Sequence, residues 1–344
     1  MLSRTRAPIH STARRRFRAP SPVPSAGDEQ LVAATLGRSR KGSQEWGAPR
    51  VGSGAGSHEL HAPAVDVLIP TLDRVTELAV TLAGLAAQDA PAFRVVIGSQ
   101  AAGAAPLQQP GIRSMIRVLE AQGRPVRVLE SGPPRGMAAQ RQFLLEHAVA
   151  EFVLYLDDDV WLEPGQLVRL VDAIRVLDCG FVGAAVQGLS YLGDHRPAEQ
   201  APFERWAGAV HPEHIRRGSP GFERWRLHNA ANLAHIAAGL ALADDEWVAY
   251  KVAWIGGCVL YRRSALLAVG GFDFGPDLPR QHAGEDVAAE WRVMQAFGGA
   301  GILPSGAVHL EAPTTLPNRS VDVFDLLWPE QHRARAPTGF ALRE

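Results

Sequence analysis

The chain has 344 residues, of which 46% are hydrophobic, and its formal net charge is −1 at pH 7. This length and composition indicate a globular protein of one large domain or two small ones, and the near-zero charge gives no reason to expect a nucleic-acid partner. No apolar run approaches the roughly 20 residues that a membrane span needs, so we expect no transmembrane segment.

The first 62 residues differ in composition from the rest of the chain. They are rich in Arg, Pro and Ser, lack hydrophobic periodicity and include the Gly/Ser-rich stretch VGSGAGS. This composition predicts a disordered N-terminal segment and linker over residues 1–62. The segment has no apolar region of the kind that a secretory signal needs. Its glycines precede the first strand instead of following it, which argues against a dinucleotide-binding loop.

From Val65 onward, strand-like and helix-like patterns alternate. The stretch AVDVLIP predicts a first strand that ends at Pro70 and Thr71, and Asp73 is expected to cap the helix that follows. Two more predicted strands, FRVVIGS and PVRVLES, alternate with the predicted helices IRSMIRVLEAQG and MAAQRQFLLEHAVA. This alternation predicts an α/β fold with a mostly parallel central sheet and helices on both faces.

Three consecutive acids follow the next predicted strand. Residues 152–156 form a continuously apolar run, typical of a strand buried on both faces, and Asp157, Asp158 and Asp159 come directly after it. In open α/β sheets, ligands bind outside the carboxyl ends of the strands. Adjacent carboxylates repel one another, and a Mg²⁺ or Mn²⁺ ion bound to substrate phosphates would neutralise them. We therefore predict a metal-diphosphate site here; the alternative is a solvated acidic turn.

Beyond the acids, the sequence predicts a helix, PGQLVRLVDAIRVL, and a strand, GFVGAAVQG. Residues 191–250 are less regular and rich in Pro, His, Arg and Trp, so we expect a long loop with one or two helices. Long insertions of this kind often form lids or binding loops. The candidates for contact with a ligand in this region are Trp206, Trp225, His228 and Asn229.

The two cysteines, Cys179 and Cys258, both lie in apolar, strand-like segments. Such positions favour buried free thiols over a disulfide. Free thiols are typical of a reducing compartment, so we expect a cytoplasmic location.

A second group of polar residues lies toward the C-terminus. Glu285 and Asp286 stand at the predicted start of a helix, where an acid is often only a cap. Gly256 and Gly257 lie upstream of this helix, and His309 follows a short strand-like segment downstream. These residues become candidates for a site because they occur in a sheet whose other strand ends in three acids.

The order VLIPT, RGMAAQRQ, LYLDDDV, IGGCVLYRRSALLAVGGFD, GEDVAAEWR and AVHLE resembles glycosyltransferase family 2, whose members have the nucleotide-diphospho-sugar transferase (GT-A) fold. The resemblance covers roughly residues 65–313. It implies one GT-A domain over residues 63–320, in which residues 191–250 are an insertion that could meet the acceptor. Residues 321–344 are then expected to be a C-terminal tail.

The resemblance also implies roles for individual residues. The residues implied in binding the nucleotide donor are Pro70, Thr71, Asp73, Arg141, Asp157 and Asp158. Those implied on the sugar and acceptor side are Gly256, Gly257 and Glu285. Asp159 and His309 are implied as ligands of a divalent metal, Mn²⁺ or Mg²⁺, and Asp286 is implied as the general base.

The implied activity is that of an inverting glycosyltransferase, which moves a sugar from a nucleotide-diphosphate donor to an acceptor hydroxyl on a saccharide, a lipid-linked molecule or a small molecule. One alternative is a catalytically degenerate nucleotide-sugar-binding protein. It is favoured by Gly98, Ser99 and Gln100, which stand where the family often has an acid. The other is a nucleotidyltransferase, but VLIPTLDRVTEL lacks the Gly-rich, Arg- or Lys-bearing loop expected after its first strand.

Overall fold

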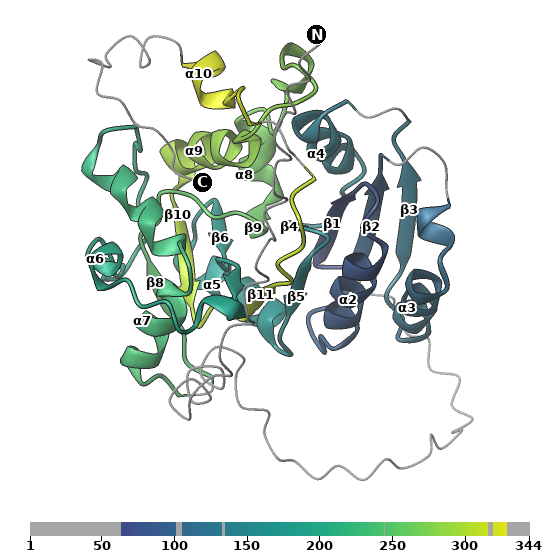
Figure 1. The fold of residues 1–344 in the computed structure, drawn as a ribbon, viewed down its shortest axis with the longest axis horizontal. Coiled ribbons are helices and arrows are strands. Elements are labelled where there is room, and N and C mark those ends of the chain that lie inside the picture. The colour runs from purple at the N-terminus through teal and green to yellow at the C-terminus, as the bar shows by residue number, and fades with distance from the viewer. Residues whose placement is uncertain (1–62, 101–104, 133–134, 244, 316–318, 329–344) are drawn as a thin grey trace, which may run out of the picture.

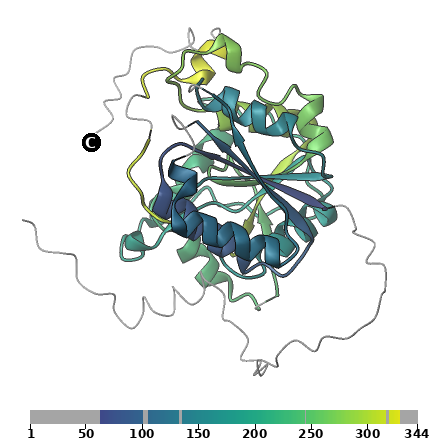
Figure 2. The same ribbon diagram turned by 90° about the vertical axis from the view of Figure 1, so that its right-hand side faces the viewer.

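The computed structural model describes residues 63–328 apart from 101–104, 133–134, 244 and 316–318 (Figure 1). The predicted disordered segment, residues 1–62, lies outside the described residues. The described part forms a central sheet between two layers of helices, which confirms the predicted α/β class (Figure 2). No helix in this part of the chain is long and apolar enough to cross a membrane.

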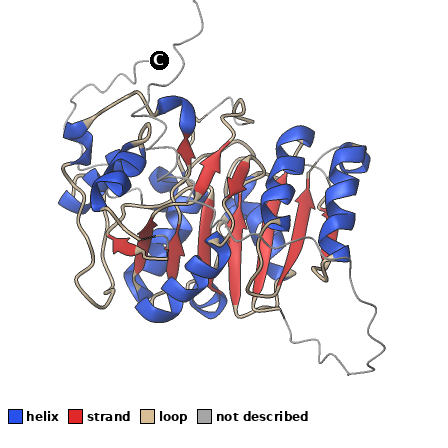
Figure 3. Ribbon diagram, turned by 90° about the horizontal axis from the view of Figure 1, so that it is seen from below, coloured by secondary structure: helices blue, strands red, loops and turns tan. Residues whose placement is uncertain are grey.

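Within the described residues, the main sheet has eight strands in the order β3-β2-β1-β4-β9-β6-β10-β8. Figure 3 shows strands in red and helices in blue. Strands β1 to β4 pair in parallel, as do β6 and β10, whereas β9 runs antiparallel to both β4 and β6. The strands are β1 Val65–Thr71, β2 Phe93–Ser99, β3 Val126–Glu130, β4 Phe152–Leu156, β6 Phe181–Gly183, β8 Val248–Tyr250, β9 Cys258–Arg262 and β10 Gly299–Leu303.

Helices cover both faces of this sheet because its central strands are apolar on both sides. In β4, Leu154 belongs to one core, while Val153 and Tyr155 belong to the other. The first core also contains side chains from α2, α3 and α5, and the second contains side chains from α4, α8 and α9. These helices are α2 Val75–Ala86, α3 Pro110–Ala121, α4 Met137–Glu146, α5 Gln166–Leu177, α8 Arg263–Ala268 and α9 Glu285–Phe297.

A second, small sheet brings distant segments to the acids. Its strands are β5 (Val160–Leu162), β11 (Ala307–His309) and β7 (Gln187–Gly188), in the order β5-β11-β7. Strand β11 pairs antiparallel with β5, with His309 opposite Val160, and the amide of Leu310 donates to the carbonyl of Asp159 at 2.8 Å. This pairing carries His309 to the end of the acidic turn.

The single strand predicted for GFVGAAVQG is wrong, because the segment divides between the two sheets. Residues of β6 pair with β9 and β10 in the main sheet, whereas those of β7 pair with β11 in the small one. Between them, the amide of Ala184 donates to the carbonyl of Cys258 at 3.0 Å. Hydrogen-bond partners far away in sequence therefore end the first strand and begin the second.

The insertion over residues 191–250 has short helices joined by loops, where a long loop with one or two helices is predicted. It contains α6 (Pro197–Gln200), the 3₁₀ helix η3 (Pro220–His228) and α7 (Asn232–Leu240). It ends in β8, which pairs antiparallel with β10 and so forms one edge of the main sheet. The insertion is therefore anchored to the domain through the sheet.

Part of the predicted C-terminal tail belongs to the folded domain. Residues 321–328 include α10 (Val323–Leu327), and Val323 and Phe324 are buried. The ring of Phe324 packs edge-on against Trp291 of α9 at 5.1 Å between centroids. The predicted boundary at residue 320 is therefore too early, because apolar side chains beyond it complete the core. Cys179 and Cys258 are both free and buried, which confirms the prediction for them.

Candidate active site

A cavity of about 440 Å³ lies at the carboxyl ends of β1 and β4. Segments from across the sequence meet in it: the loop after β1, the end of β2, the start of α4, the acids after β4, the start of α9 and the chain around β11. Its polar and charged lining includes Thr71, Arg74, Gln100, Arg141, Asp157, Asp158, Asp159, Arg280, Glu285, Asp286, His309 and Arg319. Most of the residues that the sequence singled out therefore converge on one cavity.

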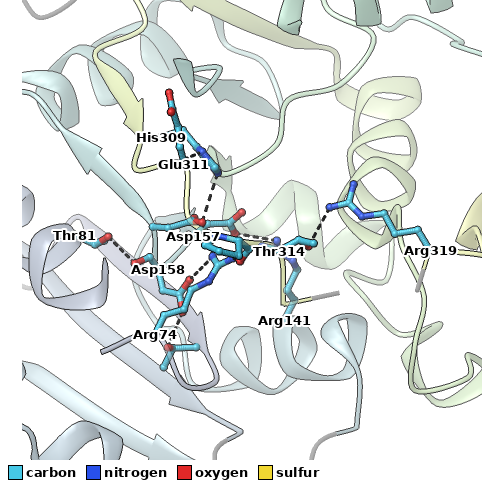
Figure 4. A network of polar contacts seen from close by, with 12 residues as sticks. Arg74, Thr81, Arg141, Asp157, Asp158, His309, Glu311, Thr314 and Arg319 are labelled. Atoms are coloured by element: carbon cyan, nitrogen blue, oxygen red, sulfur yellow. Dashed lines mark hydrogen bonds and ion pairs between the residues drawn. The ribbon is translucent and has the colours of Figure 1, made fainter. Parts of the chain in front are cut away.

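The acids occupy a tight turn between β4 and β5. The amide of Asp157 donates to the carbonyl of Gly257 at 2.9 Å, which ties the turn to the segment before β9. On the other side, the Thr81 hydroxyl of α2 donates to the carbonyl of Asp158 at 2.9 Å (Figure 4). Neighbouring elements thus hold the turn, in which Arg141 contacts the Asp157 carboxylate and Arg74 contacts those of Asp158 and Asp159.

Asp158 faces inward and is held by two donors. The hydroxyl of Thr71 donates to Asp158 Oδ2 at 2.7 Å, and Arg74 Nη1 donates to Oδ1 at 3.1 Å. Burial raises the pKa of Asp158 to about 6, against the lowering effect of Thr71 and Arg74. This carboxylate connects β1 and the loop after it to the acidic turn, and it is only 7% exposed.

Asp159 lies between a guanidinium and an imidazole. Arg74 Nη1 contacts Asp159 Oδ2, and His309 Nε2 lies 3.5 Å from the same oxygen. Burial raises the pKa of Asp159, and the charge of Arg74 opposes that rise. The Nδ1 atom of His309 accepts a hydrogen bond from the amide of Glu311 at 3.0 Å. In a neutral imidazole the ring proton is then on Nε2, the atom nearer Asp159.

Arg141 of α4 joins two acidic elements. Its Nη2 donates to Asp157 Oδ1 at 3.2 Å and its Nε donates to Glu285 Oε1 at 3.1 Å. Burial alone would lower the pKa of Arg141, but the carboxylates of Asp157 and Glu285 raise it, so the guanidinium stays charged. The hydroxyl of Tyr155 donates to the Arg141 carbonyl at 2.7 Å and fixes the helix against β4. Arg141 therefore sets the distance between the acidic turn and the start of α9.

Asp286 lies in the first turn of α9 and keeps one side open to the cavity. Its Oδ1 accepts a hydrogen bond from the amide of Val287 at 2.8 Å. Burial raises the pKa of Asp286 to about 7, and the charge of Glu285 adds to the rise. At neutral pH this carboxyl group can therefore gain or lose a proton, which an ordinary aspartate does not do.

The segment before β9 is attached to the helix that carries Asp286. Glu290 Oε2 accepts a hydrogen bond from the amide of Ile255 at 2.7 Å, and Trp291 Nε1 donates to the carbonyl of Ala253 at 2.8 Å. A side chain at Gly256 would place its Cβ 3.7 Å from Asp286 Oδ2. Gly257 has φ +80, and a Cβ there would lie 2.9 Å from Val186. Both glycines therefore support the edge of the cavity without lining it.

Several predicted residues lie elsewhere. Asp73 is exposed and does not line the cavity, and its predicted cap is wrong: Arg74 is at the N-cap of α2, which has no side-chain cap. The side chain of Arg74 is directed to the acids instead. The candidate acceptor contacts in the insertion do not line the cavity either, and each of the four has another partner. The guanidinium carbon of Arg226 lies 5.9 Å from the centre of the Trp225 ring. Trp206 packs on the core, His228 lies against Tyr250, and Asn229 donates to Glu199 at 3.1 Å.

Arg74 and Gln100 are lining residues to which the sequence analysis gave no role. Both follow strands, β1 and β2, whose carboxyl ends meet the acids. Like Asp157, both residues follow the carboxyl end of a strand, where ligands bind in open α/β sheets. A single basic or amide side chain in a loop is common, however, so the pattern becomes informative only when the tertiary contacts are known.

The donor atoms near Asp159 fit a divalent metal that a substrate helps to hold. Within the described ranges, no group of three or more His, Cys, Asp or Glu side chains converges as a ligand set. The Asp159 carboxylate and the His309 imidazole supply one oxygen and one nitrogen, 3.5 Å apart. Mg²⁺ and Mn²⁺ commonly bind through one or two protein ligands, with substrate phosphates and water completing the shell.

Comparison with known proteins places the chain in a family. No curated protein matches the chain. Among solved structures, the chain is similar to the mannosyltransferase PcManGT from Pyrobaculum calidifontis, with 16% identity and a TM-score of 0.46 over 75% of this chain and 59% of that one. It is also similar to S. aureus TarS 1-349, with 15% identity and a TM-score of 0.44 over 73% of this chain and 60% of that one.

The chain thus spans about three fifths of the length of these two proteins. Residues 66–268, more than half of the chain, match the family described as Glycosyl transferase family 2. The match includes β1, the acidic turn and β9, and the mixed sheet with helices on both faces is a GT-A-like arrangement. The chain therefore belongs to glycosyl transferase family 2.

Proposed function

We propose that the protein is an inverting glycosyltransferase that uses a nucleotide-diphospho-sugar donor and an acceptor hydroxyl, with Asp286 as general base. The observation that carries this proposal is the position of Asp286, whose pKa is about 7, on the same cavity as the acidic turn. A base of this pKa is half ionised near neutral pH and can accept a proton from a hydroxyl group. A general base typically contributes about 10²- to 10⁴-fold to the rate.

In the proposed reaction, the acceptor oxygen forms a bond to the anomeric carbon while its proton moves to a carboxylate oxygen of Asp286. The bond between the anomeric carbon and the diphosphate oxygen breaks, and its electron pair leaves with the nucleoside diphosphate. Since the acceptor attacks from the face opposite the leaving group, the configuration at the anomeric carbon inverts. Placing both substrates in one cavity would supply much of the remaining acceleration.

The other site residues are proposed to bind and orient the donor. Pro70, Thr71 and Asp157 would meet the nucleotide, and Glu285 would contact the sugar from the start of α9. Arg141 would hold Asp157 and Glu285 in register. Asp159 and His309 would hold Mn²⁺ or Mg²⁺, which supplies positive charge for the leaving diphosphate.

Thermal unfolding of the full chain tests the donor-binding part of the proposal. A panel of UDP, GDP, CDP, ADP and their sugar conjugates is measured with Mn²⁺ and with EDTA. A ligand at 100 times its Kd stabilises the folded state by about 2.7 kcal/mol, so one nucleotide should raise the Tm in a metal-dependent way. Asp159→Ala should abolish this shift, and Asp172→Asn, at an exposed position of α5, should retain it.

Assaying release of nucleoside diphosphate from the donor that the panel identifies separates the proposal from its alternative. If the protein binds a nucleotide sugar but releases no nucleoside diphosphate with any acceptor class, it is a nucleotide-sugar-binding protein. If no nucleotide changes the Tm of the folded protein, the proposed donor site is wrong.

A further inference from the structure

The Arg74 side chain has no role in the proposed reaction, although it contacts two acids of the turn. Its side chain extends from the loop after β1 and reaches Asp158 Oδ1 at 3.1 Å (Figure 4). It also contacts Asp159 Oδ2, and its Nη2 donates to the carbonyl of Pro313 at 2.6 Å. Its side chain is 16% exposed, although it lines the cavity. This single guanidinium therefore contacts both inner acids of the turn, Asp158 and Asp159, and offsets part of their negative charge.

We propose that Arg74 is the resident counter-cation of Asp158 and Asp159, and that it competes with a divalent metal for Asp159. The inference rests on the proposed metal role of Asp159 and His309. Its basis is that Arg74 Nη1 and His309 Nε2 approach the same oxygen, Asp159 Oδ2. A metal held by Asp159 and His309 would therefore lie next to the guanidinium.

The Arg74 guanidinium and a divalent metal cannot occupy the position next to Asp159 Oδ2 at the same time. The repulsion between a dication and a guanidinium a few ångströms apart is large in a partly buried site, where screening by water is weak. Each inner acid is buried, with Asp159 3% exposed. Binding of the metal to Asp159 therefore requires Arg74 to release that carboxylate, and its bond to the Pro313 carbonyl is lost in the same movement.

The hydrogen bond from the Glu311 amide to His309 also opposes binding of a metal at Asp159 and His309. The amide of Glu311 donates to Nδ1, which leaves the proton on Nε2. Ligation of a metal by Nε2 needs that nitrogen free of its proton, so this hydrogen bond must also be given up. In the free protein, the arrangement of both side chains opposes entry of a bare metal ion.

A bound nucleoside diphosphate would make it easier for the metal ion to displace Arg74 from Asp159. Its phosphate oxygens accept hydrogen bonds from a guanidinium in a forked geometry, and the displaced Arg74 lies at the same cavity where they would bind. The diphosphate also supplies oxygen ligands that the protein lacks. Metal and nucleotide should therefore bind cooperatively, and each should raise the affinity for the other by the same factor.

The experiment measures Mn²⁺ binding by the loss of the free-ion electron paramagnetic resonance signal, with and without UDP, GDP, CDP or ADP. It uses the full wild-type chain, Arg74→Gln, Arg74→Lys and Arg280→Gln. Arg280 lines the same cavity, so its variant controls for the general loss of one positive charge. Asp159→Ala controls for binding elsewhere, and circular dichroism checks that each variant is folded.

We expect wild type to bind Mn²⁺ about tenfold or more tightly with the matching nucleoside diphosphate than alone. Arg74→Gln should bind Mn²⁺ alone about tenfold more tightly than wild type and lose most of the cooperativity. Arg74→Lys, which keeps the charge, and Arg280→Gln should both stay close to wild type.

Equal Mn²⁺ affinity in wild type and Arg74→Gln, with binding lost in Asp159→Ala, would overturn the competition and leave the metal role intact. Absence of Mn²⁺ binding in every protein, with or without nucleotide, would overturn both the competition by Arg74 and the proposed metal role of Asp159 and His309. Absence of cooperativity in wild type contradicts the inference even if Arg74→Gln fails to fold. Donor binding and transfer are measured separately, so failure of the competition remains distinguishable from failure of the proposed function.

Discussion

Replacing Asp286 by Asn should make the protein more stable and abolish its activity. The pKa of Asp286 is about 7 in the folded protein and has an ordinary value of 3.8. Because the folded state holds this proton more tightly, stability decreases as the pH rises from about 4 to 7. A shift of one pKa unit corresponds to about 1.4 kcal/mol, so ionised Asp286 costs on the order of 4 kcal/mol above pH 7.

An asparagine keeps the shape of the side chain and its carbonyl can still accept from the amide of Val287, but it cannot ionise. The free energy of unfolding should therefore rise in Asp286→Asn by up to about 4 kcal/mol at pH 8, and by less at pH 5. Urea unfolding of both proteins between pH 5 and pH 8 measures this difference. In the same preparations, transfer should fall by about 10²- to 10⁴-fold, with nucleotide binding unchanged.

Asp172→Asn is the matched control, because Asp172 is exposed on α5 and does not line the cavity. Its stability difference from wild type should be small, because the exposed side chain packs on nothing in the cavity. If Asp286→Asn were less stable than wild type at pH 8, the raised pKa of this half-buried carboxyl group would be contradicted. Retained transfer, or loss of nucleotide binding parallel to loss of transfer, would refute the base role.

Two further predictions concern the same helix. The kcat/KM of wild type should increase as the pH rises through about 7, because Asp286 must be ionised to accept a proton; a profile flat from pH 5 to pH 8 would exclude it as the base. Glu290→Ala should lower the free energy of unfolding by about 1–3 kcal/mol because it leaves the buried amide of Ile255 without its acceptor. Glu290→Gln, which retains an acceptor oxygen, should lower the free energy of unfolding by less. If urea unfolding gives the same decrease for both variants, the hydrogen bond to Ile255 does not contribute to stability.

Much of the fold could be read from local patterns. The apolar run from Phe152 to Leu156 predicted a buried strand, and β4 occupies those residues with every one of them buried. The helix expected before it begins at Met137 and ends at Glu146. Apolar side chains with periods of 2 or 3.6 residues identify such elements because the burial of each depends mainly on its own periodicity.

The local patterns failed where a distant partner decided the structure. Nothing near Asp73 indicates that the Arg74 side chain is directed to Asp158, 84 residues away, or that α2 begins without a side-chain cap, so the cap predicted at Asp73 is wrong. The segment predicted as one strand after Cys179 divides because β6 and β7 find different partners, β9 and β11. Hydrogen-bond partners of this kind are set by the packing of the whole sheet.

The sequence by itself determined the chemistry available to this protein: a run of acids after a buried strand, an acidic pair at a helix start and a histidine after a short strand. Only the tertiary structure decided how these groups act on one another. Pairing of β11 with β5 brings His309 to Asp159, and burial at the start of α9 raises the pKa of Asp286. Distances and solvent exposure set these effects, and both depend on segments that meet only when the chain folds.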